Sequence, residues 1–339
     1  MQIEQIVVTG QNQVELQERP LDAGHLGASE VLIKTERTFI SAGTELANYT
    51  GTDPTVFVAG SWNAYPWPSG YANVGQVVAA GSAVERVHVG QRVFSFGPHA
   101  SYHIYDTRRL VAALPDDISS EIGAAMRMAH VAMTAIDVAQ PVAGGWVAVF
   151  GLGTVGNLAA QMFAALGANV IGVDPAAYRR ELALRCGIQH AVGGNDAEVQ
   201  EQIKELTGGQ LARVTVDAVG HSAVVLQCLE ATATFGDTIL LGSPRAPVQG
   251  NLTDLLRPIH WRWVTLKGAL EWRVPAYHQL ENEHSQLKKQ RVIVDWLRQE
   301  RITLAPLISH RLPPSAIKQA YQGLLHDKEA YLGVVLDWG

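Results

Sequence analysis

The feature that most constrains the fold of this chain is a glycine-rich turn between two apolar runs. The run Trp146–Phe150 ends in Gly-Leu-Gly-Thr-Val-Gly at 151–156, a helix-like segment follows, and a second apolar run ends at Asp174. Strand, G-x-G-x-x-G, helix, strand and acid in this order are typical of a dinucleotide site. The first glycine permits the bend, the second lets a diphosphate approach the backbone, and the third lets the helix pack on the strand. The sequence therefore predicts an α/β domain that binds a dinucleotide.

The charges around this turn indicate which dinucleotide is bound. The helix that follows offers unpaired N–H groups and the positive end of its dipole to phosphates, and no charged residue between Asp137 and Asp174 opposes them. A carboxylate at Asp174 can accept hydrogen bonds from ribose hydroxyls and would repel a 2′-phosphate, which favours NAD. Arg179 follows closely and is able to accommodate such a phosphate, so NADP stays open; a solvated helix face is the plainer interpretation of Arg179.

The composition limits the other partners of the chain. Its 339 residues are 47% hydrophobic and 17% charged, which is enough apolar material for two packed domains. A net charge of −6 without a basic cluster argues against nucleic acid or an anionic membrane as a partner. The uncharged stretch 138–173 is interrupted by glycines, Asn157 and Gln161, so we expect buried α/β structure there instead of a membrane span.

The N-terminus and the cysteines favour the cytoplasm. The first residues alternate in polarity like a strand and lack the basic–apolar–small pattern of a signal peptide. Two cysteines, Cys186 and Cys228, provide no disulfide framework and suit a reducing compartment.

The pattern of the chain changes near residue 115. Residues 1–115 contain short alternating runs between Gly, Pro and Asp turns, which indicates a β-rich domain. From residue 119 helices alternate with strands, which indicates a parallel sheet covered on both faces. The expected elements after the turn are helices at 178–186, 196–207, 279–299 and 315–326 and strands at 213–219, 238–241 and 333–337.

Several motifs together resemble the medium-chain dehydrogenase/reductase superfamily, that of the alcohol dehydrogenases. They are Leu-Pro-Asp at 114–116, a helix with Thr134, the turn at 151–156, Val-Asp-Ala-Val-Gly at 216–220 and Leu-Leu-Gly-Ser-Pro at 240–244. The resemblance implies a GroES-like catalytic domain at 1–128 and 269–339, with a Rossmann domain, a doubly wound parallel sheet, inserted at 129–268. It also implies an active site between the two domains and a homodimer.

Departures from the family motifs predict a zinc-free member. Zinc-dependent members carry Cys-Gly-Thr-Asp near the N-terminus, where this chain has Ala-Gly-Thr-Glu at 42–45, and Gly-His-Glu, where it has Gly-Tyr-Ala at 70–72. The third ligand position falls on His130, four residues before Thr134. A catalytic zinc normally needs three protein ligands, and one imidazole is too few. A metal site built from His130 with Glu45 or Glu271 stays an alternative.

A zinc-free site needs hydrogen-bond donors and a proton carrier in place of the metal. Thr44 matches the family hydroxyl that contacts the substrate alcohol, and Tyr71 lies where a ligand would point at the metal. A phenol is neutral at pH 7 and can donate to a carbonyl or a developing alkoxide, and His130 can titrate near neutral pH. Thr44, Tyr71 and His130 are the predicted catalytic residues; alternatively, Tyr71 fills the vacant metal cavity and His130 is a core histidine.

The resemblance also assigns the nicotinamide and substrate contacts. Val155 and Thr134 would pack behind the nicotinamide ring, and backbone at two strand ends would bind its carboxamide. The cofactor residues are then Gly151, Leu152, Gly153, Thr154, Val155, Gly156, Asp174, Arg179, Thr134, Gly242, Ser243, Ala269 and Leu270. The expected substrate pocket is lined by Glu45, Trp62, Tyr65, Trp67, Glu271 and Trp272, because aromatic side chains suit a bulky or sugar-like substrate. Glu271 at the cleft lip and tryptophans in the core or a dimer interface, above all Trp261 and Trp263, are the plainer interpretations.

Three functions are compatible with these residues. The first is a zinc-independent NAD(P)-dependent oxidoreductase that interconverts a secondary alcohol and a ketone on a small molecule, with similarity to bacteriochlorophyllide hydroxyethyl dehydrogenases and, more distantly, to sugar and polyol dehydrogenases. The second is an NADPH-dependent enone or quinone reductase, against which Asp174 counts. The third is a non-catalytic NAD(H)-binding redox sensor.

Overall fold

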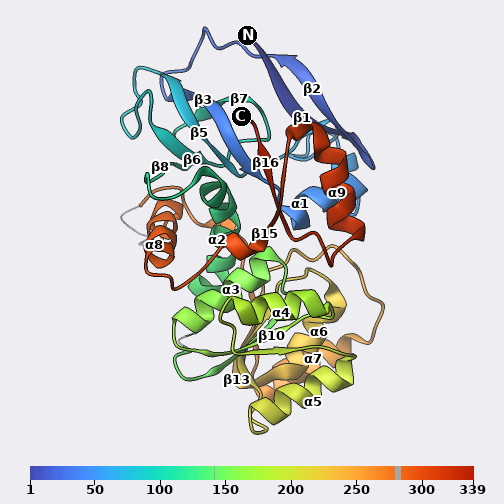
Figure 1. The fold of residues 1–339 in the computed structure, drawn as a ribbon. Helices are drawn as coiled ribbons and strands as arrows, with labels where there is room; N and C mark the ends of the chain where they lie inside the picture. Colours follow the sequence, from blue (N-terminus) through green and yellow to red (C-terminus); the bar gives the residue numbers. More distant parts are fainter. Residues whose placement is uncertain (141, 279–283) are drawn as a thin grey trace. The chain divides into compact units, whose positions relative to one another are not determined.

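A computed structural model describes residues 1–140, 142–278 and 284–339 of the chain, which divide into two compact units (Figure 1). Unit 1 comprises Met1–Arg127, Val274–Val294 and Ile308–Gly339, and unit 2 comprises Met128–Arg273 and Asp295–Leu307. The predicted boundaries at 128/129 and 268/269 lie within a few residues of two of these borders. The segment Asp295–Leu307, which the sequence had assigned to the catalytic domain, belongs to unit 2.

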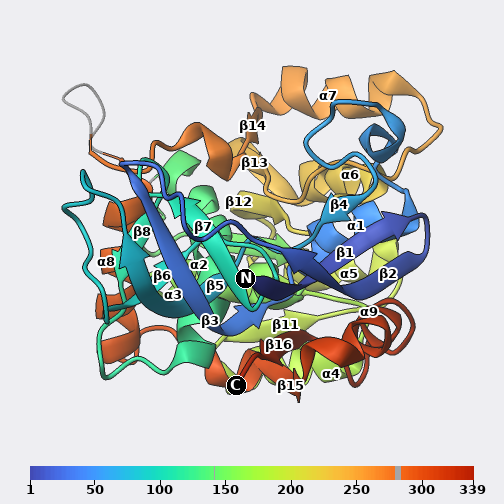
Figure 2. The same ribbon diagram turned by 90° about the horizontal axis from the view of Figure 1, so that it is seen from above.

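Unit 1 is built from two sheets. One is a seven-stranded sheet in the order β15-β16-β3-β5-β6-β8, with β7 paired to β3, and the other joins β2, β1 and β4 (Figure 2). The strands are β1 Gln2–Gly10, β2 Gln13–Pro20, β3 Glu30–Phe39, β4 Trp67–Pro68, β5 Asn73–Ala80, β6 Arg92–Ser95, β7 Tyr102–Asp106, β8 Val111–Ala113, β15 Ile308–Leu312 and β16 Gly333–Asp337. The prediction of a β-rich region over the first 115 residues is confirmed.

Helices α1 (Ala42–Thr50) and α9 (Ile317–His326) close the core of unit 1. Tyr49 of α1 and Tyr321 of α9 meet edge to face at 5.1 Å between ring centroids, and both are fully buried beside Ile6 and Leu336. A cluster of this kind joins the start, the middle and the end of the chain, so unit 1 forms only when its C-terminal part returns to the N-terminal sheet.

Unit 2 is a doubly wound parallel sheet. Its six strands run in the order β11-β10-β9-β12-β13-β14, and every neighbouring pair is parallel. Numbered from β9 this order is 3-2-1-4-5-6, that of a dinucleotide-binding Rossmann sheet. The strands are β9 Trp146–Phe150, β10 Asn169–Val173, β11 His190–Val192, β12 Ala212–Asp217, β13 Thr232–Leu240 and β14 Thr265–Gly268. The predicted fold class is confirmed.

Helices cover this sheet, and they include two that the sequence analysis did not predict. The helices are α3 Thr154–Ala165, α4 Ala177–Arg185, α5 Asp196–Leu206, α6 Ser222–Ala231 and α7 Leu252–Arg262. Helices α6 and α7 were missed. The long helices α2 (Ser120–Val138) and α8 (Gln286–Arg298) each contribute residues to both units.

The remaining sequence predictions can also be placed. The expected helix at 279–299 is realised as α8; residues 279–283 lie outside the described part of the chain. The expected helix at 315–326 is α9, preceded by one 3₁₀ turn at Pro314–Ala316. Over the described residues, no helix has the length and apolarity needed to cross a membrane.

Candidate active site

The nucleotide turn, residues 151–156, joins β9 to α3 in unit 2. Gly151 has φ +91°, a left-handed conformation that favours glycine. A Cβ on Gly156 would lie 1.8 Å from the carbonyl oxygen of Gly151, so only glycine lets α3 pack this close. A Cβ on Gly153 would meet nothing within 4 Å, which leaves open space beside the backbone where α3 begins. The roles predicted for the three glycines agree with this geometry.

Asp174 braces the nucleotide turn from the end of β10. Its Oδ2 accepts the N–H of Leu152 at 2.8 Å and its Oδ1 accepts that of Ala176 at 2.9 Å, while the side chain is almost fully buried. Arg179 lies 3.7 Å from Oδ2 and holds an ion pair with it. The neighbouring Arg180 donates to the backbone oxygen of Asp174 at 2.8 Å. Each carboxylate oxygen keeps a second lone pair for a hydroxyl, so a ribose contact is compatible with this bracing role.

The ends of β12 and β13 approach each other closely. A Cβ on Gly242 would lie 2.3 Å from the backbone nitrogen of Gly220, and a Cβ on Gly220 would lie 2.3 Å from the oxygen of Ser243. Asp217 fixes this arrangement, because its Oδ1 accepts the N–H of Val219 at 2.9 Å and that of Gly220 at 3.1 Å. Burial raises the pKa of the Asp217 carboxyl, and these two backbone donors partly oppose the rise.

The other residues predicted to contact the nicotinamide differ in how exposed they are. Ala269 is buried and donates its N–H to Leu240 at 3.0 Å, whereas Leu270 is exposed. Thr134 of α2 is buried, and its hydroxyl donates to the backbone oxygen of His130 at 3.3 Å.

His130 and Glu271 form a buried pair in unit 2. The Nδ1 of His130 lies 3.9 Å from Oε1 of Glu271, and both side chains are buried. Glu271 is therefore not the solvent-facing residue of the plainer interpretation. An imidazole beside a carboxylate is suited to holding and moving a proton.

Unit 1 contributes a hydroxyl cluster made of Ser41, Thr44 and Tyr71. The hydroxyls of Ser41 and Tyr71 are hydrogen-bonded to each other, and Thr44 is a further side-chain partner of Tyr71. Two of the three predicted catalytic residues, Thr44 and Tyr71, are thus in contact. Burial raises the pKa of the Tyr71 phenol, and the charge of Arg127 is the largest influence that lowers it. The phenol therefore stays protonated at neutral pH and can act as a donor.

Glu45 supports the hydroxyl cluster from behind. Its Oε1 accepts the N–H of Ser41 at 2.7 Å, which satisfies the backbone at the start of α1. Its Oε2 lies 2.9 Å from Nε2 of His99 and accepts the hydroxyl of Tyr321 at 2.8 Å, and all three side chains are fully buried. Both oxygens of Glu45 are therefore bound by protein groups, which favours a supporting role over the substrate contact predicted from the sequence.

The predicted aromatic lining separates into core and surface. Trp67 is 5% exposed and belongs to the core of unit 1, and the Tyr65 hydroxyl donates to the backbone oxygen of Asn48. Trp62 and Trp272 are exposed. Trp261 and Trp263 are each 69% exposed, so they are not core residues, and the alternative of a dimer interface stays a prediction.

The residues at the family's zinc positions do not fit a zinc ion. Ala42 has no ligand atom, and Tyr71 offers a neutral phenol where zinc members have the histidine of Gly-His-Glu. Across residues 1–140, 142–278 and 284–339, no group of three His, Cys, Asp or Glu side chains is placed to hold a metal. A catalytic zinc normally takes three protein ligands and one open position.

Arg127 is a further residue of unit 1 that the sequence analysis missed. It is 1% exposed, and its guanidinium carbon lies 4.7 Å from the ring centroid of Tyr71 and 4.3 Å from that of Phe96. The signal in the sequence was a single charge inside the apolar run Ala-Ala-Met-Arg-Met-Ala at 124–129.

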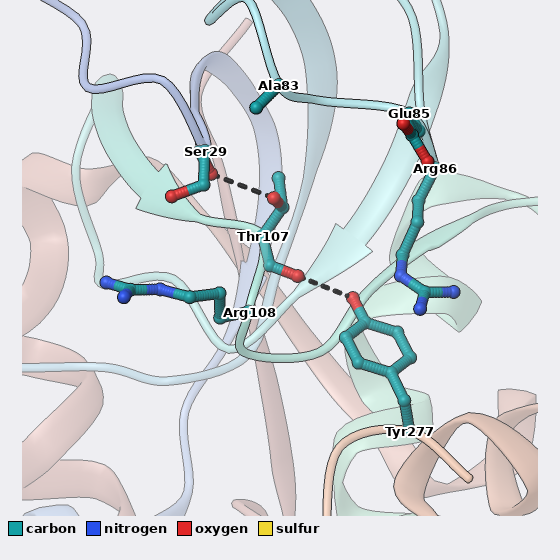
Figure 3. A pocket seen from close by; sticks show the side chains of 7 residues that line it. All are labelled: Ser29, Ala83, Glu85, Arg86, Thr107, Arg108 and Tyr277. Atoms are coloured by element: carbon teal, nitrogen blue, oxygen red, sulfur yellow. Dashed lines mark hydrogen bonds between the residues drawn. The ribbon is translucent and has the colours of Figure 1, made fainter.

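A separate hollow of about 680 Å³ lies in unit 1 and contains none of the predicted site residues (Figure 3). Its polar groups largely engage one another: the Tyr277 hydroxyl donates to the oxygen of Thr107 at 2.9 Å, and Arg86 stacks on the Tyr277 ring at 3.9 Å. Arg108 is paired with Asp106 at 2.5 Å. These contacts hold loops together. The lining residues are Ser29, Ala83, Glu85, Arg86, Thr107, Arg108 and Tyr277.

Comparisons with known proteins agree with this architecture. Residues 154–280 match the family model described as zinc-binding dehydrogenase. A D-guloside 3-dehydrogenase of Escherichia coli (strain K12) is 29% identical over 231 residues, which cover 62% of this chain and 66% of that protein. A quinone oxidoreductase of Salmonella typhimurium is 31% identical over 204 residues, which cover 55% of this chain and 60% of that protein. The matches thus span 66% and 60% of the length of these two relatives, which is less than two thirds in each case.

A solved structure shows the same fold along the whole chain. It is an Escherichia coli CFT073 protein described as a short chain alcohol dehydrogenase and complexed with the cofactor NADH. The two structures superpose with a TM-score of 0.81 at 19% sequence identity and cover 99% of both chains. The GroES-like and Rossmann units predicted from the sequence motifs are confirmed as the fold of the protein.

Proposed function

The chain belongs to the medium-chain dehydrogenase/reductase superfamily, and we propose that it is a zinc-independent, NAD-dependent oxidoreductase that interconverts a secondary alcohol and a ketone. The observation that carries this proposal is the hydroxyl cluster: Tyr71, bonded to Ser41 and close to Thr44, stands where zinc members hold a metal ligand. A hydrogen-bonded phenol can supply to a substrate oxygen the polarisation and the proton that zinc chemistry otherwise supplies.

In this proposal the nucleotide turn and the ends of β12 and β13 hold the cofactor. The backbone N–H groups at the start of α3 receive the diphosphate, beside the open space at Gly153. Asp174 receives the ribose hydroxyls, and its negative charge disfavours a 2′-phosphate. The nicotinamide nucleotide, when bound, supplies or accepts the hydride. Backbone groups at 242–243 and 269–270 orient the nicotinamide ring.

The protein side chains handle the proton. In ketone reduction the Tyr71 hydroxyl donates its proton to the substrate oxygen, and the Ser41 and Thr44 hydroxyls hold the phenol in place and stabilise it after the transfer. In alcohol oxidation Tyr71 must first lose its proton to solvent, and its phenolate then takes the proton of the substrate alcohol; after ketone reduction the phenolate regains a proton from solvent. The buried pair of His130 and Glu271 provides a second group that can exchange a proton. The hydroxyl cluster therefore serves both directions.

The substrate class we propose is a polar, sugar-like secondary alcohol. Trp62 of unit 1 and Trp272 of unit 2 each expose a ring that is suited to stacking on such a molecule. The similar D-guloside 3-dehydrogenase supports this choice, since its name describes the dehydrogenation of a glycoside.

The second candidate is an NADPH-dependent enone or quinone reductase, which the 31% identical quinone oxidoreductase favours. The two proposals differ in nucleotide and in substrate. Purified protein is incubated with NADH or NADPH and a panel of ketoses, glycosides, enones and quinones, and the absorbance of the reduced nucleotide is followed. Turnover of ketoses with NADH supports the first candidate, whereas turnover confined to quinones or enones with NADPH replaces it with the second.

We propose further that the protein is a cytoplasmic homodimer associated through unit 2. Strand β14 is the edge of the parallel sheet, and the adjoining helix α7 has no buried residue. Large apolar side chains of this region are exposed, and an apolar patch at a sheet edge is typical of an interface between copies. The exposed apolar residues of this region are Phe235, Leu252, Leu256, Trp261, Trp263 and Leu266.

A further inference from the structure

Arg127 is a buried charge that the mechanism so far does not use. It lies on α2 within the part of that helix that belongs to unit 1. The same half of α2 is tied to unit 1 by the Ser120 hydroxyl, which donates to Glu36 at 2.5 Å, and by the close approach that Gly123 permits toward Leu114. The guanidinium is therefore held at a fixed place in the unit.

Two aromatic rings hold this guanidinium. Its central carbon lies 4.7 Å from the centroid of Tyr71 and 4.3 Å from that of Phe96, and the residue is 1% exposed. Arginine side chains stay protonated in proteins, so the positive charge is permanent. A permanent positive charge that is buried and lies 4.7 Å from the ring centroid of the proposed proton donor points to a use for that charge.

We propose that Arg127 is a positioning residue of the reaction: its positive charge stabilises the negative charge that develops on the Tyr71 oxygen and on a substrate oxygen bound to it. In this way the guanidinium takes over the electrostatic part of the task that zinc performs in related enzymes, while the phenol keeps the proton. The inference rests on the proposed function, because it uses Tyr71 as the proton donor.

The other groups around Tyr71 define the electrostatic balance. The hydroxyls of Ser41 and Thr44 stabilise a charged phenol, as Arg127 does, and the carboxylate of Glu45 opposes it. The charge of Arg127 also acts on Tyr105, and burial raises the pKa of Tyr105 to about 12. The guanidinium carbon of Arg109 lies 5.0 Å from the centroid of the Tyr105 ring. Arg127 is thus a buried cation that acts on Tyr71, and Arg109 is an exposed cation that lies over the ring of Tyr105.

The test replaces Tyr71 with difluorotyrosine, which ionises at lower pH than tyrosine, and follows its ¹⁹F resonance during a pH titration of the protein without substrate. Arg127→Met removes the charge at similar length and should move the titration midpoint to higher pH. Arg127→Lys keeps a charge and should leave the midpoint closer to the parent. Arg109→Met is the matched control and should leave it unchanged. A midpoint that stays in place in Arg127→Met, with circular dichroism and melting temperature intact, overturns the proposal.

A second variant and turnover assays test the role of Arg127 further. If Arg127→Met does not fold, the neutral but polar variant Arg127→Gln is titrated in its place. A titration midpoint at higher pH is again expected, and an unchanged midpoint again contradicts the proposal. In turnover assays Arg127→Met should lower kcat by about tenfold to hundredfold and shift the pH profile to higher pH, and an unchanged profile contradicts the role. The fluorine titration needs no turnover, so a failure of the proposed function and a failure of this inference are distinguishable.

Discussion

The nucleotide turn of unit 2 and the hydroxyl cluster of unit 1 are built from different material. The turn offers backbone groups to a ligand. Its shape requires glycine at positions such as Gly156, where a Cβ would collide with neighbouring backbone atoms. The hydroxyl cluster presents side chains, and its geometry depends on Glu45, which follows Thr44 on α1, and on Arg127 of α2. A backbone site is fixed by local folding, whereas a side-chain site is fixed by the packing around it. Mutations should therefore affect the two regions differently.

The largest effect is expected in the hydroxyl cluster. Tyr71→Phe keeps the ring against Arg127 but removes the proton donor, so kcat should fall by about a hundredfold or more while the melting temperature stays close to the parent. Tyr277→Phe removes a phenol hydroxyl from the separate hollow of the same unit and is the control, with kcat unchanged. A Tyr71→Phe enzyme within a few-fold of the parent would return Tyr71 to the role of a space filler.

A pair of glycine substitutions separates folding from binding in the nucleotide turn. Gly156→Ala places a Cβ against the oxygen of Gly151 and should lower the free energy of unfolding by about 3 kcal/mol. Gly153→Ala points into open space and should leave unfolding unchanged, yet weaken NADH binding by about tenfold, or ~1.4 kcal/mol. Chemical denaturation and calorimetry measure the two quantities. Equal effects of the two substitutions on stability would mean that the turn is not built as described.

A smaller effect is expected at Asp174. Because its carboxylate braces Leu152 as well as facing the ribose site, Asp174→Ser should weaken binding of both nucleotides. The affinity ratio should move toward NADPH by about tenfold, since the repulsion of a 2′-phosphate is lost. Fluorescence titration with NADH and NADPH measures this ratio. An unchanged ratio would show that Asp174 acts on the turn alone and does not read the ribose.

The same contrast explains which parts of the molecule the sequence predicts. The nucleotide turn, Asp174 and the strand ends at Gly242 are local patterns, and the topology of unit 2 follows from alternating strands and helices. Helix α7 was missed because Pro258 interrupts its sequence and several of its apolar residues, such as Leu256 and Trp261, are exposed, which obscures the pattern of a buried helical face. Sequence order places motifs, but it does not reveal which distant side chains meet.

The hydroxyl cluster illustrates that limit. Tyr71 and Thr44 were predicted from motif positions, but the contact of Tyr71 with Ser41 was not, because the two residues lie 30 positions apart in the chain. The contact of Glu45 with Tyr321 spans 276 positions and was likewise not predicted. Glu45 was predicted to contact the substrate, but both of its carboxylate oxygens are bound by groups inside unit 1. The role of Arg127 follows from its contacts with the rings of Tyr71 and Phe96, which the sequence alone does not show.

The most direct test of the metal-free mechanism combines metal analysis with turnover. The purified protein is dialysed against a chelator, its zinc content is measured by mass spectrometry, and the oxidation of a glycoside panel is followed through NADH formation. The account predicts well under one zinc per chain and an unchanged turnover rate after chelation. One tightly bound zinc per chain, with activity lost on its removal and restored on its return, would contradict it.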